Sequence, residues 1–373
     1  MCFQNPVRRT GRNPAGTIRV MVLILLVSIG LTNCGSAKPS MTKYSYEFLG
    51  SFDTLIQFMG YAESKAAFEV MAKKGQARFE ELNRQYDIYH EYEGIRNVMT
   101  INGQAGNAPV KVGKEILDLV KFSIKWHDKS PGVCNIALGP VLALWHDART
   151  AGLDFPDTAA LPDMAALKKA SLLCNLKDVI VDDAAGTVYL AKAGMSLDVG
   201  AVAKGFACQI VADELKAAGY DSFVISGGGN IIAVGSPKDG FRAKWGIGIQ
   251  NPDGNALNPD DPPLDIAYVT DESVVTSGDY QRTYVVDGKA YHHLIDPVTL
   301  MPADFFRSVS VLTPDSGLAD FYSTTLFLLP LEEGKKAAAA AGLDALWVLP
   351  NGTQVATDGM KAVLKKLGGA TNK

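Results

Sequence analysis

A glycine-rich turn between two apolar segments constrains the fold more than any other feature of this 373-residue chain. Gly227, Gly228 and Gly229 stand between two apolar runs that are typical of strands. No helical pattern follows the turn, although a dinucleotide-binding fingerprint requires one. The sequence therefore predicts a strand pair and argues against a dinucleotide-binding Rossmann motif. The glycines provide either a tight turn or a close approach of the backbone to a ligand.

The rest of the chain mixes strand and helix patterns without repeats. Strands are predicted as a pair around Gly50 in residues 44–58, as a hairpin in 179–190, in the block 223–249, and at 266–269, 283–286 and 309–312. Helices are predicted at residues 64–82 and 114–126, before Gly219, from Asp320 onward, and before Gly342. Residues 250–263 are rich in Asn, Pro, Asp and Gly, which predicts a loop. No linker divides the chain, so we expect one catalytic unit with two lobes.

The first residues have the pattern of an export signal. Four arginines precede the uncharged apolar run Val20–Leu31, which is shorter than the roughly 20 residues of a membrane-spanning helix. The run ends at Leu31-Thr32-Asn33-Cys34, which resembles a bacterial lipoprotein cleavage box. A secreted or anchored protein without this lipid, or a chance apolar segment, are the alternatives. We expect a signal peptide at 1–33, lipidation of Cys34, a linker at 34–43 and a folded domain at 44–367.

Charge and cysteine content narrow the possible partners. With 36 basic and 40 acidic residues, the chain has no positive excess to hold a phosphate backbone, so we do not expect it to bind nucleic acid. After Cys34 the chain has three cysteines, Cys134, Cys174 and Cys208, and an odd number cannot all pair in disulfides. Their spacing matches no metal-binding motif. We expect them to be buried as small apolar side chains.

Residues 196–206 combine a small-residue turn with the start of a helix. Exposed N–H groups at such a start bind anions, and Lys204 would share a helical face with Ala201 and Cys208. The segment is therefore a candidate phosphate site. The alternative is an ordinary helix that Asp198 caps, with Lys204 in solvent.

Two further motifs carry side chains suited to chemistry. In a strand, His293 would share a face with Tyr291 and Ile295, and adjacent histidines do not easily share one tetrahedral zinc, so His293 fits a base or a hydrogen-bonding role. Asp320 and Thr324 lie four residues apart at a predicted helix start, and their hard oxygen atoms suit Mg²⁺ shared with substrate phosphates. Helix capping is the alternative for Asp320.

Taken together, the motifs resemble those of the ApbE family of FAD:protein FMN transferases, from about Tyr44 to Leu367. The segments that carry the likeness are Asp198–Gly205, Gly227–Asn230, Thr276–Arg282, His293–Pro297 and Ala319–Thr324. Gly132–Pro140 is similar to a flavin-contacting segment of that family. Asn135 stands where an Asp is common in the family, and Leu300 where a Gly is common.

The resemblance implies a T-fold-like α+β enzyme, placed by its lipid on the extracytoplasmic face of the membrane. Such an enzyme uses FAD and Mg²⁺ to attach FMN to a Thr or Ser of an acceptor protein and releases AMP. The resemblance implies that the main-chain oxygen of Ala201 holds the metal together with Asp320 and Thr324. It implies FAD contacts from Asp198, Lys204, Leu294, Leu49, Tyr89, Val133, Cys134 and Asn135. We expect His293, as general base, and Lys204 to be catalytic.

Two other functions remain open at the level of sequence. An FAD pyrophosphatase of the same architecture would let water attack and would release FMN and AMP. A non-catalytic flavin-binding lipoprotein would store or deliver the cofactor. Storage needs neither a base nor a metal pair, so the joint presence of Lys204, His293, Asp320 and Thr324 favours an enzyme.

Overall fold

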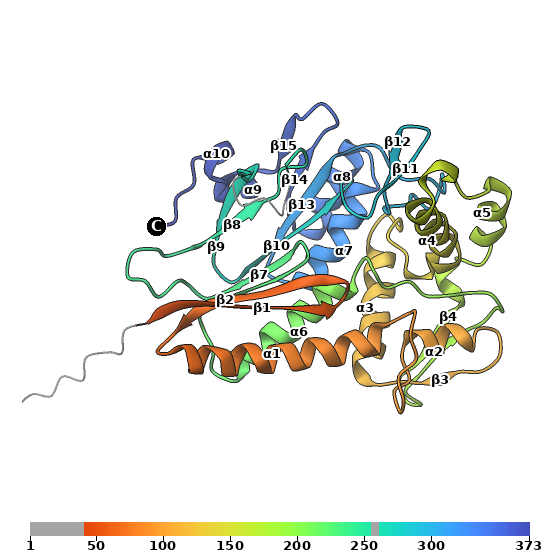
Figure 1. Ribbon diagram of the computed structural model, residues 1–373, viewed down its shortest axis with the longest axis horizontal. Coiled ribbons are helices and arrows are strands. Elements are labelled where there is room, and N and C mark those ends of the chain that lie inside the picture. Colours follow the sequence, from red (N-terminus) through yellow and green to blue (C-terminus); the bar gives the residue numbers. More distant parts are fainter. Residues whose placement is uncertain (1–40, 255–260) are drawn as a thin grey trace, which may run out of the picture. The chain divides into compact units, whose positions relative to one another are not determined.

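A computed structural model describes residues 41–254 and 261–373, in which helices and strands alternate irregularly (Figure 1). The strands are β1 (Thr42–Ser51), β2 (Thr54–Ala62), β3 (Val110–Lys111), β4 (Val179–Asp182), β5 (Thr187–Leu190), β6 (Phe223–Gly227), β7 (Asn230–Val234), β8 (Trp245–Ile249), β9 (Asp265–Val269), β10 (Glu272–Gly278), β11 (Tyr284–Val286), β12 (Lys289–Tyr291), β13 (Ser308–Thr313), β14 (Asp344–Val348) and β15 (Gln354–Ala356). The helices are α1 (Lys65–Tyr86), α2 (Val98–Gly103), α3 (Lys114–Lys129), α4 (Gly139–Asp154), α5 (Met164–Ser171), α6 (Ala203–Ala217), α7 (Ser316–Phe327), α8 (Leu331–Ala341), α9 (Asp358–Val363) and α10 (Lys365–Gly368). Short 3₁₀ helices are η1 (Ile136–Leu138), η2 (Pro156–Thr158) and η3 (Leu176–Asp178). The protein is of the α+β class, as expected.

The largest sheet of the described residues has the strand order β1-β2-β6-β7-β10-β13-β14-β15, and neighbouring strands are antiparallel. The predicted strand pair is confirmed as the hairpin β6–β7, in which Gly227 pairs with Asn230. Gly228 and Gly229 form its turn with φ angles of +58° and +92°. A Cβ atom at Gly228 would lie 2.2 Å from Oγ1 of Thr54. The turn therefore needs glycine for both its backbone angles and its space.

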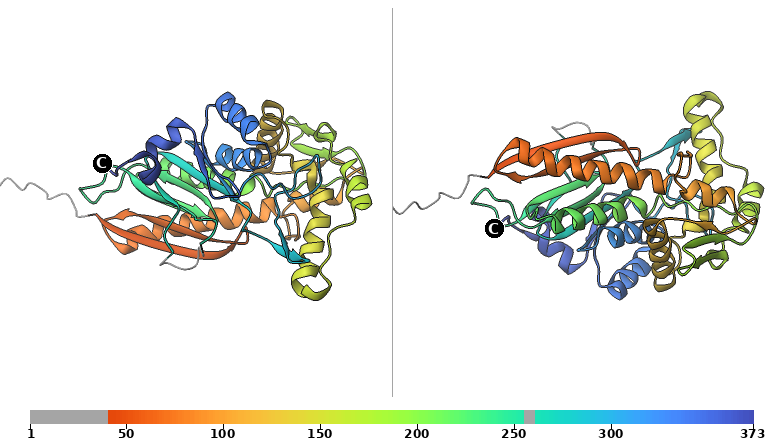
Figure 2. Two further views of the ribbon diagram at one scale, coloured as in Figure 1. Left: turned by 90° about the horizontal axis from the view of Figure 1, so that it is seen from above. Right: turned by 90° about the horizontal axis from the view of Figure 1, so that it is seen from below.

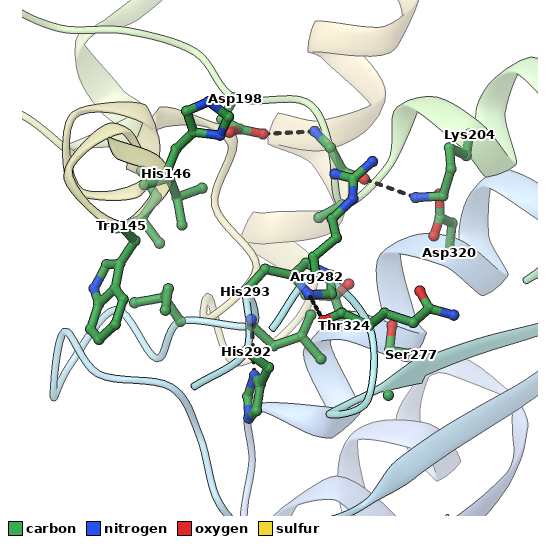
Figure 3. Close-up of a pocket in the computed structure, with 18 of the residues that line it drawn as sticks. Trp145, His146, Asp198, Lys204, Ser277, Arg282, His292, His293, Asp320 and Thr324 are labelled. Atoms are coloured by element: carbon green, nitrogen blue, oxygen red, sulfur yellow. Dashed lines mark hydrogen bonds between the residues drawn. The ribbon is translucent and has the colours of Figure 1, made fainter. Parts of the chain in front are cut away.

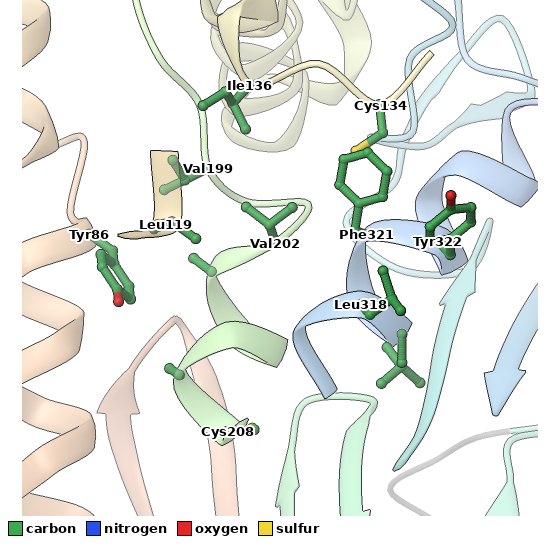
Figure 4. Close-up of a cluster of buried hydrophobic side chains, with 14 of the residues drawn as sticks. Tyr86, Leu119, Cys134, Ile136, Val199, Val202, Cys208, Leu318, Phe321 and Tyr322 are labelled. Carbon is green, nitrogen blue, oxygen red and sulfur yellow. The ribbon is translucent and has the colours of Figure 1, made fainter. Parts of the chain in front are cut away.

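The two faces of this sheet are buried under different elements (Figures 1 and 2), because alternate residues of a strand point to opposite sides. Ile225 and Val275 belong to the larger core, which also contains side chains of α1, α3, α6 and α7 (Figure 4). Val224 and Val274 belong to a second core with Trp245 of β8, residues of β9 and α9, and Leu364, which follows α9. Every residue of α7 is buried, so this helix is held from all sides.

A third apolar cluster joins α4 and α5 to the β11–β12 hairpin. Trp145, Tyr284 and Leu300 are buried members of this cluster. The indole N–H of Trp145 donates a hydrogen bond to the backbone oxygen of Leu300, with 3.0 Å between the atoms. This cluster supports one side of the candidate site described below.

The described residues, 41–254 and 261–373, form one compact unit. Its first strand begins at Thr42, within the segment 34–43 that the sequence assigns to a linker. At the other end, the backbone oxygen of Asn372 accepts a hydrogen bond from Ala243, so the packed structure extends beyond residue 367. The predicted signal peptide and Cys34 lie outside the described residues. Within those residues, no helix has both the length and the hydrophobicity to span a membrane.

Most predicted elements are confirmed, but several local details differ. Helix α7 begins at Ser316, where Asp315 caps it, so Asp320 lies in the second turn rather than at the start. Helix α6 begins at Ala203 without a side-chain cap; Asp198 therefore does not cap it, and Ala201 lies in the preceding turn. His293 follows the end of β12 instead of lying within a strand. The sequence patterns do not predict α4, α5 or β10.

Candidate functional site

A cavity of about 420 Å³ gathers most of the residues that the sequence singled out (Figure 3). The predicted residues that line it are Tyr89, Val133, Cys134, Asn135, Asp198, Ala201, Lys204, His293, Leu294, Asp320 and Thr324. Leu49 is the exception, since it does not line the cavity and is 75% exposed on β1. Figure 3 shows Lys204 and Asp320 on one side of the cavity and Trp145 and His146 on the other.

The junction of α6 and α7 forms the floor that carries Asp320. The backbone N–H of Gly205 donates a hydrogen bond of 2.8 Å to Oδ2 of Asp320. A Cβ atom at Gly205 would lie 2.3 Å from the backbone oxygen of Ser316 and 2.5 Å from Cβ of Asp320. Glycine at this position therefore allows the two helices to approach and places the carboxylate beside Lys204.

Asp320 is an ionisable group in a buried position. Burial raises its pKa, while Lys204, the Gly205 amide and a hydrogen bond from the Asn230 side chain lower it. One turn later, Thr324 also faces the cavity and is 8% exposed. Among the described residues, no cluster of three or more His, Cys, Asp or Glu residues could hold a metal alone. The Asp320 carboxylate and the Thr324 hydroxyl line the cavity together with Ala201, and a hard cation such as Mg²⁺ accepts oxygen donors of this kind with water or phosphate.

The turn before α6 is held by its own polar groups. Oδ1 of Asp198 accepts a hydrogen bond from the Gly200 amide at 2.8 Å, and the Lys204 ammonium donates to the Gly200 carbonyl at 3.3 Å. The Asp198 amide in turn donates to the Ile136 carbonyl. Asp198 thus shapes the turn that presents Ala201, and Lys204 extends over it at the cavity wall.

The adjacent histidines differ in what their ring nitrogens contact. His292 lies within hydrogen-bond distance of the Ala303 carbonyl through Nε2 and accepts the Leu294 amide through Nδ1, so both nitrogens are engaged. His293 lies 3.1 Å from the Gln281 carbonyl through Nδ1. Because a carbonyl only accepts, Nδ1 carries the proton in the neutral ring and Nε2 keeps its lone pair. Burial, Arg282 and Lys204 lower the pKa of His293 to about 3, so the ring is neutral at pH 7.

The segment before α4 contributes a second wall. Asn135 accepts a hydrogen bond from the Ala137 amide through Oδ1 and donates to the Cys174 carbonyl through Nδ2, both at 2.8 Å. Cys134, Cys174 and Cys208 are buried free thiols, as expected. Burial raises the pKa of the Cys134 thiol, so this residue lines the cavity as a neutral group.

Two arginines also line the cavity, although the sequence assigned no role to either. Arg282 has a left-handed φ of +49° and lies 3.9 Å from the exposed Asp53 carboxylate. Arg149 of α4 contacts Nδ1 of His146 at 2.9 Å, and both burial and Arg282 lower its pKa. With Lys204, the cavity holds three cationic side chains, and the carboxylates of Asp53, Asp198 and Asp320 also line it. It therefore offers partners both to an anionic group and to a cation.

Sequence reasoning missed several other residues of the cavity wall. Trp145, His146 and Arg149 come from α4. Asn230 and Arg282 lie in the Gly227–Asn230 and Thr276–Arg282 motifs, but the sequence assigned neither residue a role. An isolated basic or aromatic residue gives no signal of where it points until the helix that carries it is placed. A smaller cavity of about 260 Å³ shares Tyr89, Asp198, Lys204 and Arg282 with the first, so the two cavities are neighbours.

Known proteins resemble this chain in sequence and in fold. A sequence model of the ApbE family matches residues 52–347. The FAD:protein FMN transferase of Treponema pallidum (strain Nichols) is 35% identical over 346 residues, which cover 89% of this chain and 91% of that protein. The FAD:protein FMN transferase of Klebsiella pneumoniae (strain 342) is 31% identical over 277 residues, which cover 73% of this chain and 81% of that protein. The crystal structure of the ApbE protein of Thermotoga maritima MSB8 aligns with a TM-score of 0.72 at 25% identity, over 86% of this chain and 99% of that chain.

Proposed function

The chain belongs to the ApbE family and is a flavin transferase, and from that premise we propose that it moves FMN from FAD onto a Thr or Ser hydroxyl of an acceptor protein, with Mg²⁺ as cofactor and AMP as product. The observation that carries this proposal is the convergence of Lys204, His293, Asp320 and Thr324 on one cavity. Cationic side chains and oxygen donors are the groups that phosphoryl transfer requires.

Each bond change in this reaction has a candidate group. The acceptor oxygen forms a bond to the phosphorus of the FMN half, and the bond from that phosphorus to the bridging oxygen of the pyrophosphate breaks. AMP leaves with the bridging oxygen. The hydroxyl proton passes to Nε2 of His293, whose lone pair is free because Nδ1 faces the Gln281 carbonyl.

The low pKa of His293 fits this role once FAD is bound. In the protein without ligand, the positive charges of Arg282 and Lys204 help to lower it. A bound pyrophosphate would offset these charges and raise the pKa, so His293 would become a better proton acceptor when substrate is present.

The cation would be held by Asp320, Thr324 and the main-chain oxygen of Ala201. A divalent cation bound there would neutralise pyrophosphate oxygens and stabilise the charge of the transition state. Lys204 would contact the same phosphates from the first turn of α6, and Asp198 would hold the turn beneath them.

We also propose that the enzyme acts outside the cytoplasm, anchored by a lipid on Cys34 after removal of residues 1–33. The support is the arginine-rich start, the short apolar run and the cleavage-box pattern of the sequence. Cys34→Ser should abolish incorporation of a labelled fatty acid and release the protein from the membrane fraction. Retention of label by this variant would contradict the proposal.

Incubation with FAD, Mg²⁺ and an acceptor protein tests the transferase function. Flavin fluorescence that remains on the denatured acceptor in a gel, with one AMP released per FMN attached, is the expected result. Free FMN and AMP without labelled acceptor would instead identify an FAD pyrophosphatase. Asp320→Ala should remove both activity and its dependence on Mg²⁺, whereas unaltered stimulation by Mg²⁺ would refute the metal assignment.

A further inference from the structure

Asn230 has a buried oxygen that no group of the described residues satisfies. The residue is 2% exposed, and its Oδ1 atom lacks a hydrogen-bond partner. Other residues of the described chain also have unpartnered buried side-chain atoms, among them Ser51, Ser273, Ser308 and Ser316, but of all these residues only Asn230 lines the cavity. A buried acceptor without a partner destabilises the protein, so a ligand that supplied the partner would remove that cost.

The orientation of the Asn230 amide follows from its neighbour. The side chain forms a hydrogen bond with the Asp320 carboxylate. An ionised carboxylate only accepts, so the NH₂ group of Asn230 must face Asp320, and the carbonyl oxygen is left for another partner.

The backbone holds Asn230 in a fixed position. It is the first residue of β7 and pairs with Gly227 of β6 and Val275 of β10, in the middle of the sheet. The turn before it cannot shift easily, because Gly228 packs against Thr54. Adjacent hydroxyls do not compete for the role: Thr276 is bonded to Ser310 at 2.7 Å and Ser277 to Ser323 at 2.8 Å.

We propose that Oδ1 of Asn230 is an additional oxygen ligand of the divalent cation at Asp320 and Thr324, acting directly or through one water molecule. The inference rests on the cation site of the proposed function. A neutral amide oxygen is a ligand that hard cations accept, and it adds to the coordination without adding charge. Asn230 would thereby hold the cation and orient the Asp320 carboxylate at the same time.

A titration of the full chain with Mn²⁺, with and without FAD, tests this proposal without an activity assay. Bound Mn²⁺ is measured as the loss of the electron paramagnetic resonance signal of the free ion. Asn230→Ala should weaken Mn²⁺ binding roughly 10-fold or more. Asn230→Asp keeps an oxygen in place and should bind Mn²⁺ at least as well as the wild type. Ser273→Ala, which removes another unpartnered buried oxygen of the same sheet away from the cavity, is the matched control and should leave binding unchanged.

Thermal unfolding separates a ligand role from a purely structural one. In Asn230→Asp, a second carboxylate beside Asp320 should lower the melting temperature of the metal-free protein, and Mn²⁺ should raise it by more than in the wild type. Wild-type Mn²⁺ affinity in Asn230→Ala, or equally weak binding in Asn230→Asp, would overturn the proposal. If Asp320→Ala also left Mn²⁺ binding intact, the cation site itself would be wrong, and the proposed function would lose its metal.

Discussion

The backbone N–H of Gly205 on α6 donates a hydrogen bond to Oδ2 of Asp320 on α7, with 2.8 Å between the two atoms. This contact joins a loop-to-helix turn that carries Lys204 to a fully buried helix that carries the carboxylate. The position of Asp320 in the cavity therefore depends on a residue without a side chain.

Gly205→Ala should destabilise the protein by about 1–3 kcal/mol, because the added methyl group would meet Ser316 and Asp320 at distances no Cβ atom tolerates. It should also weaken the stimulation by Mg²⁺, since the carboxylate would be displaced. Urea unfolding and Mg²⁺ titration of activity measure the two effects. Gly103→Ala is the control: a Cβ atom there meets nothing within 4 Å, so stability should be unchanged or slightly higher. Equal behaviour of the two variants would contradict the packing argument.

His293 should remain neutral in the free enzyme between pH 5.5 and 8, because its pKa is lowered to about 3. Its ring proton signal in NMR should therefore not titrate in this range. Arg282→Gln removes a neighbouring positive charge and should raise the pKa, whereas Arg282→Lys keeps the charge and should not. A wild-type His293 signal that titrates near 6.5 would disprove the assignment.

The lowered pKa of His293 should also make the free energy of unfolding depend on pH. The unfolded chain binds a proton at His293 below about pH 6.5, while the folded chain does not until about pH 3. The contribution of His293 to the free energy of unfolding is thus present above pH 6.5 and is lost as the pH falls from there toward 3. His293→Gln should show a flatter decline over this window in urea unfolding at several pH values.

Leu300 stores backbone strain at a buried position. Its φ is +61° and it is 5% exposed in the cluster with Trp145. Leu300→Ala should cost about 2–5 kcal/mol of unfolding free energy through the lost side chain. Leu300→Gly loses the same side chain but relieves the strain, so it should be about 1 kcal/mol more stable than Leu300→Ala. If the alanine variant proves the more stable in urea unfolding, no strain is present.

Asn135 makes two hydrogen bonds, one as acceptor and one as donor, that an ionised Asp at this position could not both keep. Asn135→Asp keeps the acceptor for the Ala137 amide but turns a carboxylate oxygen toward the Cys174 carbonyl, which now lacks its donor. The variant should be destabilised by about 1–3 kcal/mol at neutral pH. The loss should shrink in acid, where a protonated Asp can donate again, and a pH-independent loss would point to another cause. Unfolding at pH 7 and pH 4 distinguishes these results.

The sequence alone predicts much of the local structure and of the reaction class. Periodicity is a local property, so it indicates the β1–β2 and β6–β7 hairpins and most of the long helices. The motifs around Asp198, His293 and Asp320 combine rare residue types at short spacings, and these point to phosphate chemistry and to the ApbE family. The predictions fail where the first residue of a helix depends on packing. The sequence predicts that helix α7 begins at Asp320, but the first turn of the helix is buried and Asp315 caps it.

Only the tertiary structure decides which residues share the cavity, which of them are protonated and which have hydrogen-bond partners. Asn230, Arg149 and His293 are far apart in the chain, and no spacing rule relates them. The missing partner of Asn230 and the low pKa of His293 both arise from burial and from charges contributed by other elements. Sequence determines the chemical groups that are present, because side-chain chemistry is local; folding determines their protonation and their partners, because desolvation and electrostatic interaction depend on distance in space.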